Sequence, residues 1–321
     1  MSKNQMSNKS KSAVSRRGFL ATAAAGSASA AIALSQKSAK GRTPAPKRGR
    51  VRWRFEARRV EKTFLDGSTV PFFRFVVVGS TRSNGAVPLM QDEENRKVCV
   101  SIENLVDFPI QPTILDYESG PIIMPQETGL WEFTMPPEGT WMFTESLLGN
   151  VASSAGFGAA MISNSATDPV KMRQYYLLYQ DADDRWNNAI DNGNVPDETV
   201  FEPNYHTLNG LSYPDTMNDS DTRLNCTLGE EVLVRVGNLS NVRHSLHFHG
   251  FHAQLLRRNN KFNNTLPEKD TFGIPAFSTT EIVMPVVQVG EYPLHPHGLT
   301  TTTDNGLYQG GSGTMIDAQI G

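Results

Sequence analysis

The sequence is poor in cysteine and has no histidine before His206, and both scarcities restrict the chemistry available to it. The 321 residues include 2 cysteines and 7 histidines. Two cysteines exclude a scaffold built from disulfides and any four-cysteine zinc or iron–sulfur centre. The net charge of −3 offers no basic surplus, which argues against a nucleic-acid partner. A chain of this length is expected to form about two domains.

Long hydrophobic runs are also missing, apart from one Ala-rich stretch near the start. Residues 1–36 carry no acid, and their basic residues are Lys3, Lys9, Lys11, Arg16 and Arg17. The two arginines precede Phe-Leu and an apolar stretch of mostly Ala and Gly that is too short to span a membrane. This pattern is similar to a twin-arginine export signal. We expect a periplasmic or secreted protein, a mature net charge near −8 after loss of those five positive charges, and no membrane span in the mature chain.

The remainder of the chain has the pattern of an all-β protein. Residues 37–50 are basic and contain Pro and Gly, which predicts a flexible leader. From Val51 onward, short β-rich runs alternate with Gly, Pro, Asn and Asp, and long stretches of helical period are scarce. The acidic, turn-rich segment 181–199 suggests an inter-domain loop with one helical turn at most.

An internal repeat indicates two similar domains. Residues 98–105 (VCVSIENL) match 232–239 (VLVRVGNL), and two further matches follow in the same order: MP…GTW with MP…GEY, and GFGAAMI with GGSGTMI. We therefore predict a first domain at 51–165, a linker at 166–200 and a second domain at 201–321. Met135 and Met284 occupy matching positions and are expected in the two cores.

Six histidines fall in two clusters, HSLHFHGFH (244–252) and LHPHG (294–298). Side chains alternate along a strand, so His247 and His249 are expected on one side, as are His295 and His297. If the two strands are neighbours, four imidazoles converge, and such a set suits copper, zinc, nickel or iron. His244 stands at odd spacing from His247 and is expected on the opposite face.

These segments resemble the last cupredoxin domain of a multicopper oxidase, on the residues HSLHFHGF, then GEYPLHPHG, then GGSGTMI. The resemblance covers 51–321, strongly in the second half and weakly in the first. It implies two tandem cupredoxin-like Greek-key β-barrels, as in two-domain laccases and copper nitrite reductases. It also implies that His247, His249, His295 and His297 are copper ligands of the trinuclear kind, and that His244 matches a type 1 copper ligand.

The chain departs from the family pattern at the type 1 copper site and at the first-domain positions of the trinuclear site. The type 1 thiolate position is Pro296, and the second type 1 histidine position is Thr301. In the first domain, which contains no histidine, the four matching positions are Thr113, Leu115, Thr144 and Ser146. We therefore expect no type 1 copper and no ordinary laccase activity.

The remaining candidates have simpler structural explanations. His206 is expected at the surface, and His252 is expected to be a surface or hydrogen-bonded residue. Cys99 lies in a hydrophobic strand and Cys226 precedes another, so we expect both to be buried thiols rather than a disulfide.

Three functions remain open. The first is an exported copper protein with a histidine-only site, with zinc as the alternative metal. It would act as an oxidoreductase on a small-molecule substrate or with an electron-transfer partner, or it would bind copper for handling. The second is a metal-free structural or interaction protein of the cell envelope. The third is an oxidase that obtains its missing ligands from a different polypeptide. Relatives with two domains are commonly trimers, so a homotrimer is a further expectation.

Overall fold

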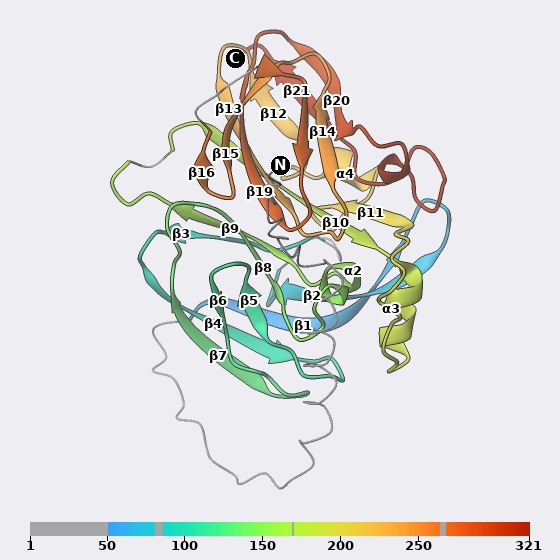
Figure 1. Ribbon diagram of the computed structural model, residues 1–321. Helices are drawn as coiled ribbons and strands as arrows, with labels where there is room; N and C mark the ends of the chain where they lie inside the picture. Colours follow the sequence, from blue (N-terminus) through green and yellow to red (C-terminus); the bar gives the residue numbers. More distant parts are fainter. Residues whose placement is uncertain (1–50, 81–85, 169, 264–267) are drawn as a thin grey trace, which may run out of the picture. The chain divides into compact units, whose positions relative to one another are not determined.

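A computed structural model describes residues 51–80, 86–168, 170–263 and 268–321, and all of them belong to one compact unit (Figure 1). The predicted export signal and leader lie outside the described residues. None of the helices within the described ranges has the length and hydropathy needed to cross a bilayer.

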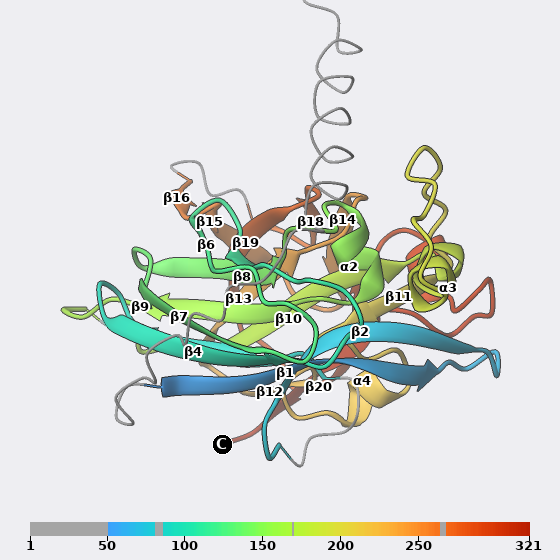
Figure 2. The ribbon, with the colours of Figure 1, turned by 90° about the horizontal axis from the view of Figure 1, so that it is seen from below.

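The first half of the described chain consists of two sheets. Its elements are β1 (Val51–Thr63), β2 (Thr69–Val77), β3 (Leu89–Glu93), β4 (Lys97–Asn104), β5 (Pro112–Ile114), β6 (Glu118–Ser119), β7 (Thr128–Thr134), β8 (Gly139–Glu145), α2 (Val151–Ala155) and β9 (Ala159–Asn164). One sheet has the order β2-β1-β4-β7, whose strands lie side by side in Figure 2, and the other has the order β3-β9-β8-β5-β6.

The second half repeats this arrangement. Its elements are β10 (Arg173–Ala182), α3 (Asp184–Asp191), β11 (Tyr205–Leu208), α4 (Asp215–Asn218), β12 (Leu224–Thr227), β13 (Glu231–Asn238), β14 (His244–Phe248), β15 (Ala253–Arg258), β16 (Lys261–Phe262), β17 (Glu268–Lys269), β18 (Thr271–Ile274), β19 (Ser278–Pro285), β20 (Gly290–Pro296), the 3₁₀ helix η1 (Thr300–Thr302) and β21 (Thr314–Gln319). One sheet has the order β11-β10-β13-β19-β15-β16, with β17 also paired to β15, and the other has the order β12-β21-β20-β14-β18.

The strand orders of the two halves match, including the parallel pairing of β1 with β4 and of β10 with β13, except that β15, β16 and β17 extend the larger sheet of the second half. The predicted all-β fold of tandem cupredoxin-like barrels is confirmed. All three sequence repeats fall on equivalent elements: β4 and β13, the β7–β8 and β19–β20 connections, and β9 and β21. The repeated Asn104 and Asn238 are fully buried. Each donates from Nδ2 to a carbonyl of the loop that follows its strand, that of Phe108 or Val242, and to a carbonyl further along the chain, that of Ile123 or Ile274. The repeat therefore preserves these buried asparagine hydrogen bonds as well as the strand.

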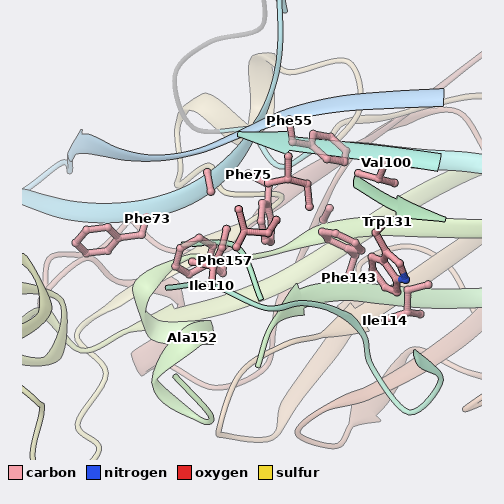
Figure 3. Close-up of a cluster of buried hydrophobic side chains, with 14 of the residues drawn as sticks. Phe55, Phe73, Phe75, Val100, Ile110, Ile114, Trp131, Phe143, Ala152 and Phe157 are labelled. Atoms are coloured by element: carbon pink, nitrogen blue, oxygen red, sulfur yellow. The ribbon is translucent and has the colours of Figure 1, made fainter. Parts of the chain in front are cut away.

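Each half encloses its own apolar core. Figure 3 shows the first core, in which the rings of Phe55, Phe75 and Phe143 pack together between the two sheets. The second core lies between the sheets that carry β13 and β14. Met135 and Met284 are fully buried, one in each core, as expected from their matching positions.

A third apolar cluster joins the halves. It packs Met142 of β8 and Ile162 of β9 against Tyr176 and Leu178 of β10. Beside it, the hydroxyl of Thr140 in β8 donates to the buried carboxylate of Glu281 in β19, 2.7 Å away. The range 166–200 contains two regular elements, strand β10 and the eight-residue helix α3, whose start is capped by Asp183 accepting from the backbone N–H of Arg185. Segment 181–199 is thus more ordered than its turn-rich composition suggests, while the domain boundaries stay predictions.

Candidate metal site

Strands β14 and β20 bring the two histidine clusters together. They are antiparallel neighbours, and His247 stands directly opposite His295. The pairing extends beyond the strand ends, because the backbone N–H of His249 donates to the carbonyl of Pro293 and that of His297 donates to the carbonyl of Ser245. The sequence expectation that these two segments are neighbouring strands is correct.

Alternation along the two strands sets which side chains face the core. Leu246, Phe248, Leu294 and Pro296 point inward and are buried. The four histidines of odd number, His247, His249, His295 and His297, consequently lie on the outer face of the sheet. Two inward leucines therefore fix the register, since a slip of one residue would expose the apolar set.

The four rings are close neighbours. The ring centroid of His247 lies 4.6 Å from that of His249, 5.7 Å from that of His295 and 5.2 Å from that of His297. The Nε2 atoms of His249 and His295 are 2.9 Å apart, within hydrogen-bonding distance. Within the described ranges, however, no three His, Cys, Asp or Glu side chains are arranged to hold a metal ion as they stand. The four imidazoles form a cluster of donors rather than a closed coordination shell.

Two of the rings are oriented through Nδ1. His295 Nδ1 lies 2.7 Å from the carbonyl oxygen of Pro296, to which it can only donate. His247 Nδ1 lies 2.8 Å from the hydroxyl of Thr271 on β18. A proton on Nδ1 leaves the Nε2 lone pair of a neutral imidazole available. Burial, followed by the charges of His247 and His295, lowers the pKa of His249, which favours its neutral form.

His244 faces the opposite way, as its spacing predicts. It is 2% exposed, its Nε2 lies 2.7 Å from Asp181, and its ring stacks on that of Tyr179 at 4.5 Å and 5°. The other ring nitrogen, Nδ1, is buried and has no hydrogen-bond partner in the described structure. The structure thus separates His244 from the outward-facing cluster and engages its Nε2 with a carboxylate.

The same carboxylate binds His206, so the expectation of a surface role for His206 is wrong. His206 is 2% exposed, and its Nδ1 lies 2.6 Å from Asp181 Oδ1. Its strand β11 pairs with β10 so that His206 lies directly opposite Asp181. Ser240 also donates to Asp181. Burial would raise the pKa of Asp181, but the charge of His244 and the hydrogen bonds from His206 and His244 outweigh it, so the pKa is lowered.

The remaining candidates lie elsewhere. His252 is exposed, as expected, and both cysteines are buried free thiols. Pro296 is paired with Leu246 in the sheet, and neither cysteine lies at that position. In the first half, Thr113 stands opposite Thr144, in the register that His247 and His295 occupy in the second half.

A groove of about 760 Å³ runs beside the imidazole cluster. Three of the histidines, His249, His295 and His297, lie in its wall, and the rest of the wall comes from β20, the η1–β21 region and the segment around α4. Sequence reasoning missed this groove because its walls come from segments that are distant in the chain.

Comparison with known proteins agrees with this geometry. Residues 181–310 match the family model of the multicopper oxidase. Residues 181–310 are therefore similar to a multicopper oxidase domain. The predicted resemblance to the multicopper oxidase superfamily is thereby confirmed, and the matched range of this domain contains all seven histidines. No curated protein matches the sequence.

Solved structures show the same fold over most of the chain. The blue copper oxidase of Nitrosomonas europaea is 20% identical, with a TM-score of 0.70 over 83% of this chain and 85% of that one. The multicopper oxidase mgLAC is 17% identical, with a TM-score of 0.69 over 83% and 85%. The copper nitrite reductase of Nitrosomonas europaea is 17% identical, with a TM-score of 0.60 over 83% and 93%. The chain therefore shares its fold with these proteins over most of its length.

Proposed function

We propose that this protein is an exported copper-binding protein in which His247, His249, His295 and His297 hold the metal. The observation that supports this best is the placement of four imidazoles on one outer sheet face, with ring centroids 4.6 to 5.7 Å from that of His247. The match of this half to a multicopper oxidase domain supports copper as the metal. Zinc is the alternative, because four neutral imidazoles also suit it.

The residues present fit such an ion in their donor chemistry. Metal-binding imidazoles commonly donate their second ring N–H to a carbonyl or another acceptor, which fixes the ring. His295 makes this bond to Pro296, and His247 Nδ1 is paired with Thr271. The 2.9 Å separation of the His249 and His295 Nε2 atoms also suits two ligands of one ion at the usual metal–nitrogen distance of about 2.0–2.1 Å.

Copper in such a site supplies one-electron redox chemistry, which is the basis for proposing an oxidoreductase. In this proposal the protein orients the imidazoles through Thr271 and the Pro296 carbonyl. It has no type 1 copper, because Pro296 provides no thiolate and His244 is engaged by Asp181. In the first half, the positions that correspond to His247 and His295 are occupied by Thr113 and Thr144, which face each other across β5 and β8.

Metal content tests the proposal directly. The protein, purified with its native export segment, is loaded with excess copper, dialysed, and assayed for bound copper and zinc, with electron spin resonance of any Cu(II). We expect about one copper per chain and nitrogen hyperfine structure from imidazoles. A value below about 0.2 copper per chain overturns the copper site. Zinc retained in place of copper favours the zinc alternative, and loss of both favours a metal-free structural role.

The export component rests on residues 1–36 alone and needs its own test. Arg16 and Arg17 form the pair on which twin-arginine recognition depends. Fractionation of cells that produce the full chain should place the shortened protein outside the cytoplasm. A variant with Arg16→Lys and Arg17→Lys should remain inside at full length, and equal export of the two overturns this part of the proposal.

A further inference from the structure

We propose that a cavity on the outer face of the β2-β1-β4-β7 sheet binds a small organic acid, with its carboxylate between Arg58 and Arg74 and its apolar body against aliphatic side chains. The inference does not depend on the proposed copper site, because none of the described residues in the cavity wall is a histidine. The cavity volume of about 430 Å³ falls within the range of about 300–1,000 Å³ typical of small-molecule sites.

The pairing of β1 with β2, which lie side by side in Figure 2, places the two arginines directly opposite each other. The neighbouring positions Ala57, Phe73 and Phe75 belong to the first apolar core. Alternation along the strands therefore turns Arg58 and Arg74 to the other face of the sheet. Like charges directly opposite each other on antiparallel strands destabilise the pairing. An anion between the two guanidinium groups would reverse that effect.

Arg74 brings a buried positive charge to the cavity wall. It is 3% exposed, its Cζ lies 4.6 Å from the centre of the Phe72 ring, and its Nη1 donates to the carbonyl of Gly210, 3.1 Å away. Burial lowers the pKa of this guanidinium to about 10, so the group is still charged at neutral pH. An anion beside a buried charge offsets the loss of its hydration.

Arg58 brings a second guanidinium that remains open to solvent. Its side chain is 37% exposed, and its Nη1 donates to Glu56, 3.3 Å away. Its Nε is buried and has no hydrogen-bond partner within the described part of the chain. Guanidinium groups bind carboxylates through paired N–H donors. A carboxylate in this cavity can therefore accept from both arginines.

The remainder of the described wall selects an acid with an aliphatic body. It consists mostly of valines and similar side chains, among them Val60 and Val76 on the same sheet face as the arginines, and none of its described residues is aromatic. Val78 and Leu89 are 48% and 43% exposed, so apolar surface is available for a ligand to cover. Asp221 is the one acid in the described wall, and it is exposed, so water and salt screen its charge.

The test measures the binding of hexanoate to the protein by isothermal titration calorimetry. Hexanamide has the same chain without the charge, and acetate has the charge without most of the chain. We expect saturable binding of hexanoate, with both comparison compounds bound more weakly by about tenfold or more. Equal affinity for hexanamide or for acetate overturns the inference.

Variants of the arginines locate the binding. Arg58→Gln should weaken hexanoate binding by about tenfold or more. Arg54→Gln removes an exposed arginine of the same strand that lies outside the cavity wall, and it should leave the affinity unchanged. Arg74→Lys keeps the charge but removes the planar set of donors, so it should also weaken binding. Full affinity in Arg58→Gln, or equal losses in Arg58→Gln and Arg54→Gln, overturns the inference.

The His247→Ala/His295→Ala protein separates this inference from the copper proposal. It should bind hexanoate like the unmodified protein. Loss of hexanoate binding in this variant would place the carboxylate at the imidazole cluster and overturn the cavity inference. An unmodified protein that binds hexanoate but no copper overturns the copper proposal alone, and one that binds copper but no hexanoate overturns this inference alone.

Discussion

His247 and His295 face each other across the β14–β20 pair, although they come from separate histidine clusters. Their ring centroids are 5.7 Å apart, and each ring makes a hydrogen bond through Nδ1 to a different partner, Thr271 or the Pro296 carbonyl. This pair forms the centre of the outward imidazole cluster. His249 lies two residues after His247, and His297 lies two residues after His295.

Removing both members of this pair should abolish copper binding. In His247→Ala/His295→Ala only His249 and His297 remain, and two imidazoles hold copper far more weakly than four. We expect less than about 0.2 copper per chain after dialysis, measured by elemental analysis. His252→Ala, which removes an exposed histidine outside the cluster, should keep the full copper content. Equal copper in all three proteins would locate the site elsewhere.

The copper-loaded protein should be free of an intense blue absorption band near roughly 600 nm, because that band requires a copper–thiolate bond. Cys99 and Cys226 are buried at 2% and 4% exposure, and neither belongs to β14 or β20. Visible spectra recorded during copper titration test this, with the Cys99→Ser/Cys226→Ser protein as control. A blue band that disappears in that control would contradict the absence of type 1 copper.

The sequence predicts the imidazole cluster well because its geometry is local along each strand. Two-residue alternation places His247 with His249 and His295 with His297, and the internal repeat identifies the strands that carry them. The register between β14 and β20 needs the buried leucines and the whole sheet, and the structure supplies it.

Contacts between distant segments could not be predicted in this way. Sequence reasoning places His206 at the surface because no local pattern links it to Asp181, its partner on the neighbouring strand. The one available signal was an acid at the end of the apolar run YYLLYQD (175–181), where a buried carboxylate needs partners. The groove was missed for the same reason, since its wall combines the segments around Tyr213, His295 and Tyr308.

Asp181 should be important for stability. It is fully buried and accepts hydrogen bonds from His206, His244 and Ser240. Asp181→Ala leaves these donors buried without an acceptor and should lower the free energy of unfolding by about 3–5 kcal/mol in denaturant titrations. Asp168→Ala, at an exposed position, provides the control and should have little effect. Equal stability of the two variants would contradict a structural role for the carboxylate.

The contribution of Asp181 should also depend on pH. Its pKa in the folded protein lies below its ordinary value, so its ionised form stabilises the fold above the unfolded pKa of about 3.9. The contribution should decline as the pH falls from that value towards the folded pKa. Measured from pH 6 downward, the stability difference between wild type and Asp181→Asn should therefore shrink below about pH 4. A difference that grows on acidification would contradict the sign of this linkage.

Arg235 and Glu281 form a buried ion pair between β13 and β19, with side-chain exposures of 0% and 2%. Burial lowers the pKa of Arg235, and Glu281 partly offsets this effect. Glu281→Leu leaves the buried guanidinium of Arg235 without its carboxylate partner and should lower the free energy of unfolding by about 3–5 kcal/mol. Arg235→Met/Glu281→Leu should recover most of that loss. Glu291→Leu, which removes an exposed partner of Arg223, should cost less than about 1 kcal/mol.

The two cysteines should be unreactive until the protein unfolds. Both are buried free thiols, and burial raises the pKa of Cys99 and, to about 12, that of Cys226. Because the thiolate is the nucleophile, a disulfide reagent at pH 8 should label neither in the folded protein and both in guanidinium chloride. Val195→Cys adds a thiol at a position that is 90% exposed and should react at once. Prompt labelling of the wild-type protein, or an intact mass lower by two hydrogens, would show an accessible thiol or a disulfide instead.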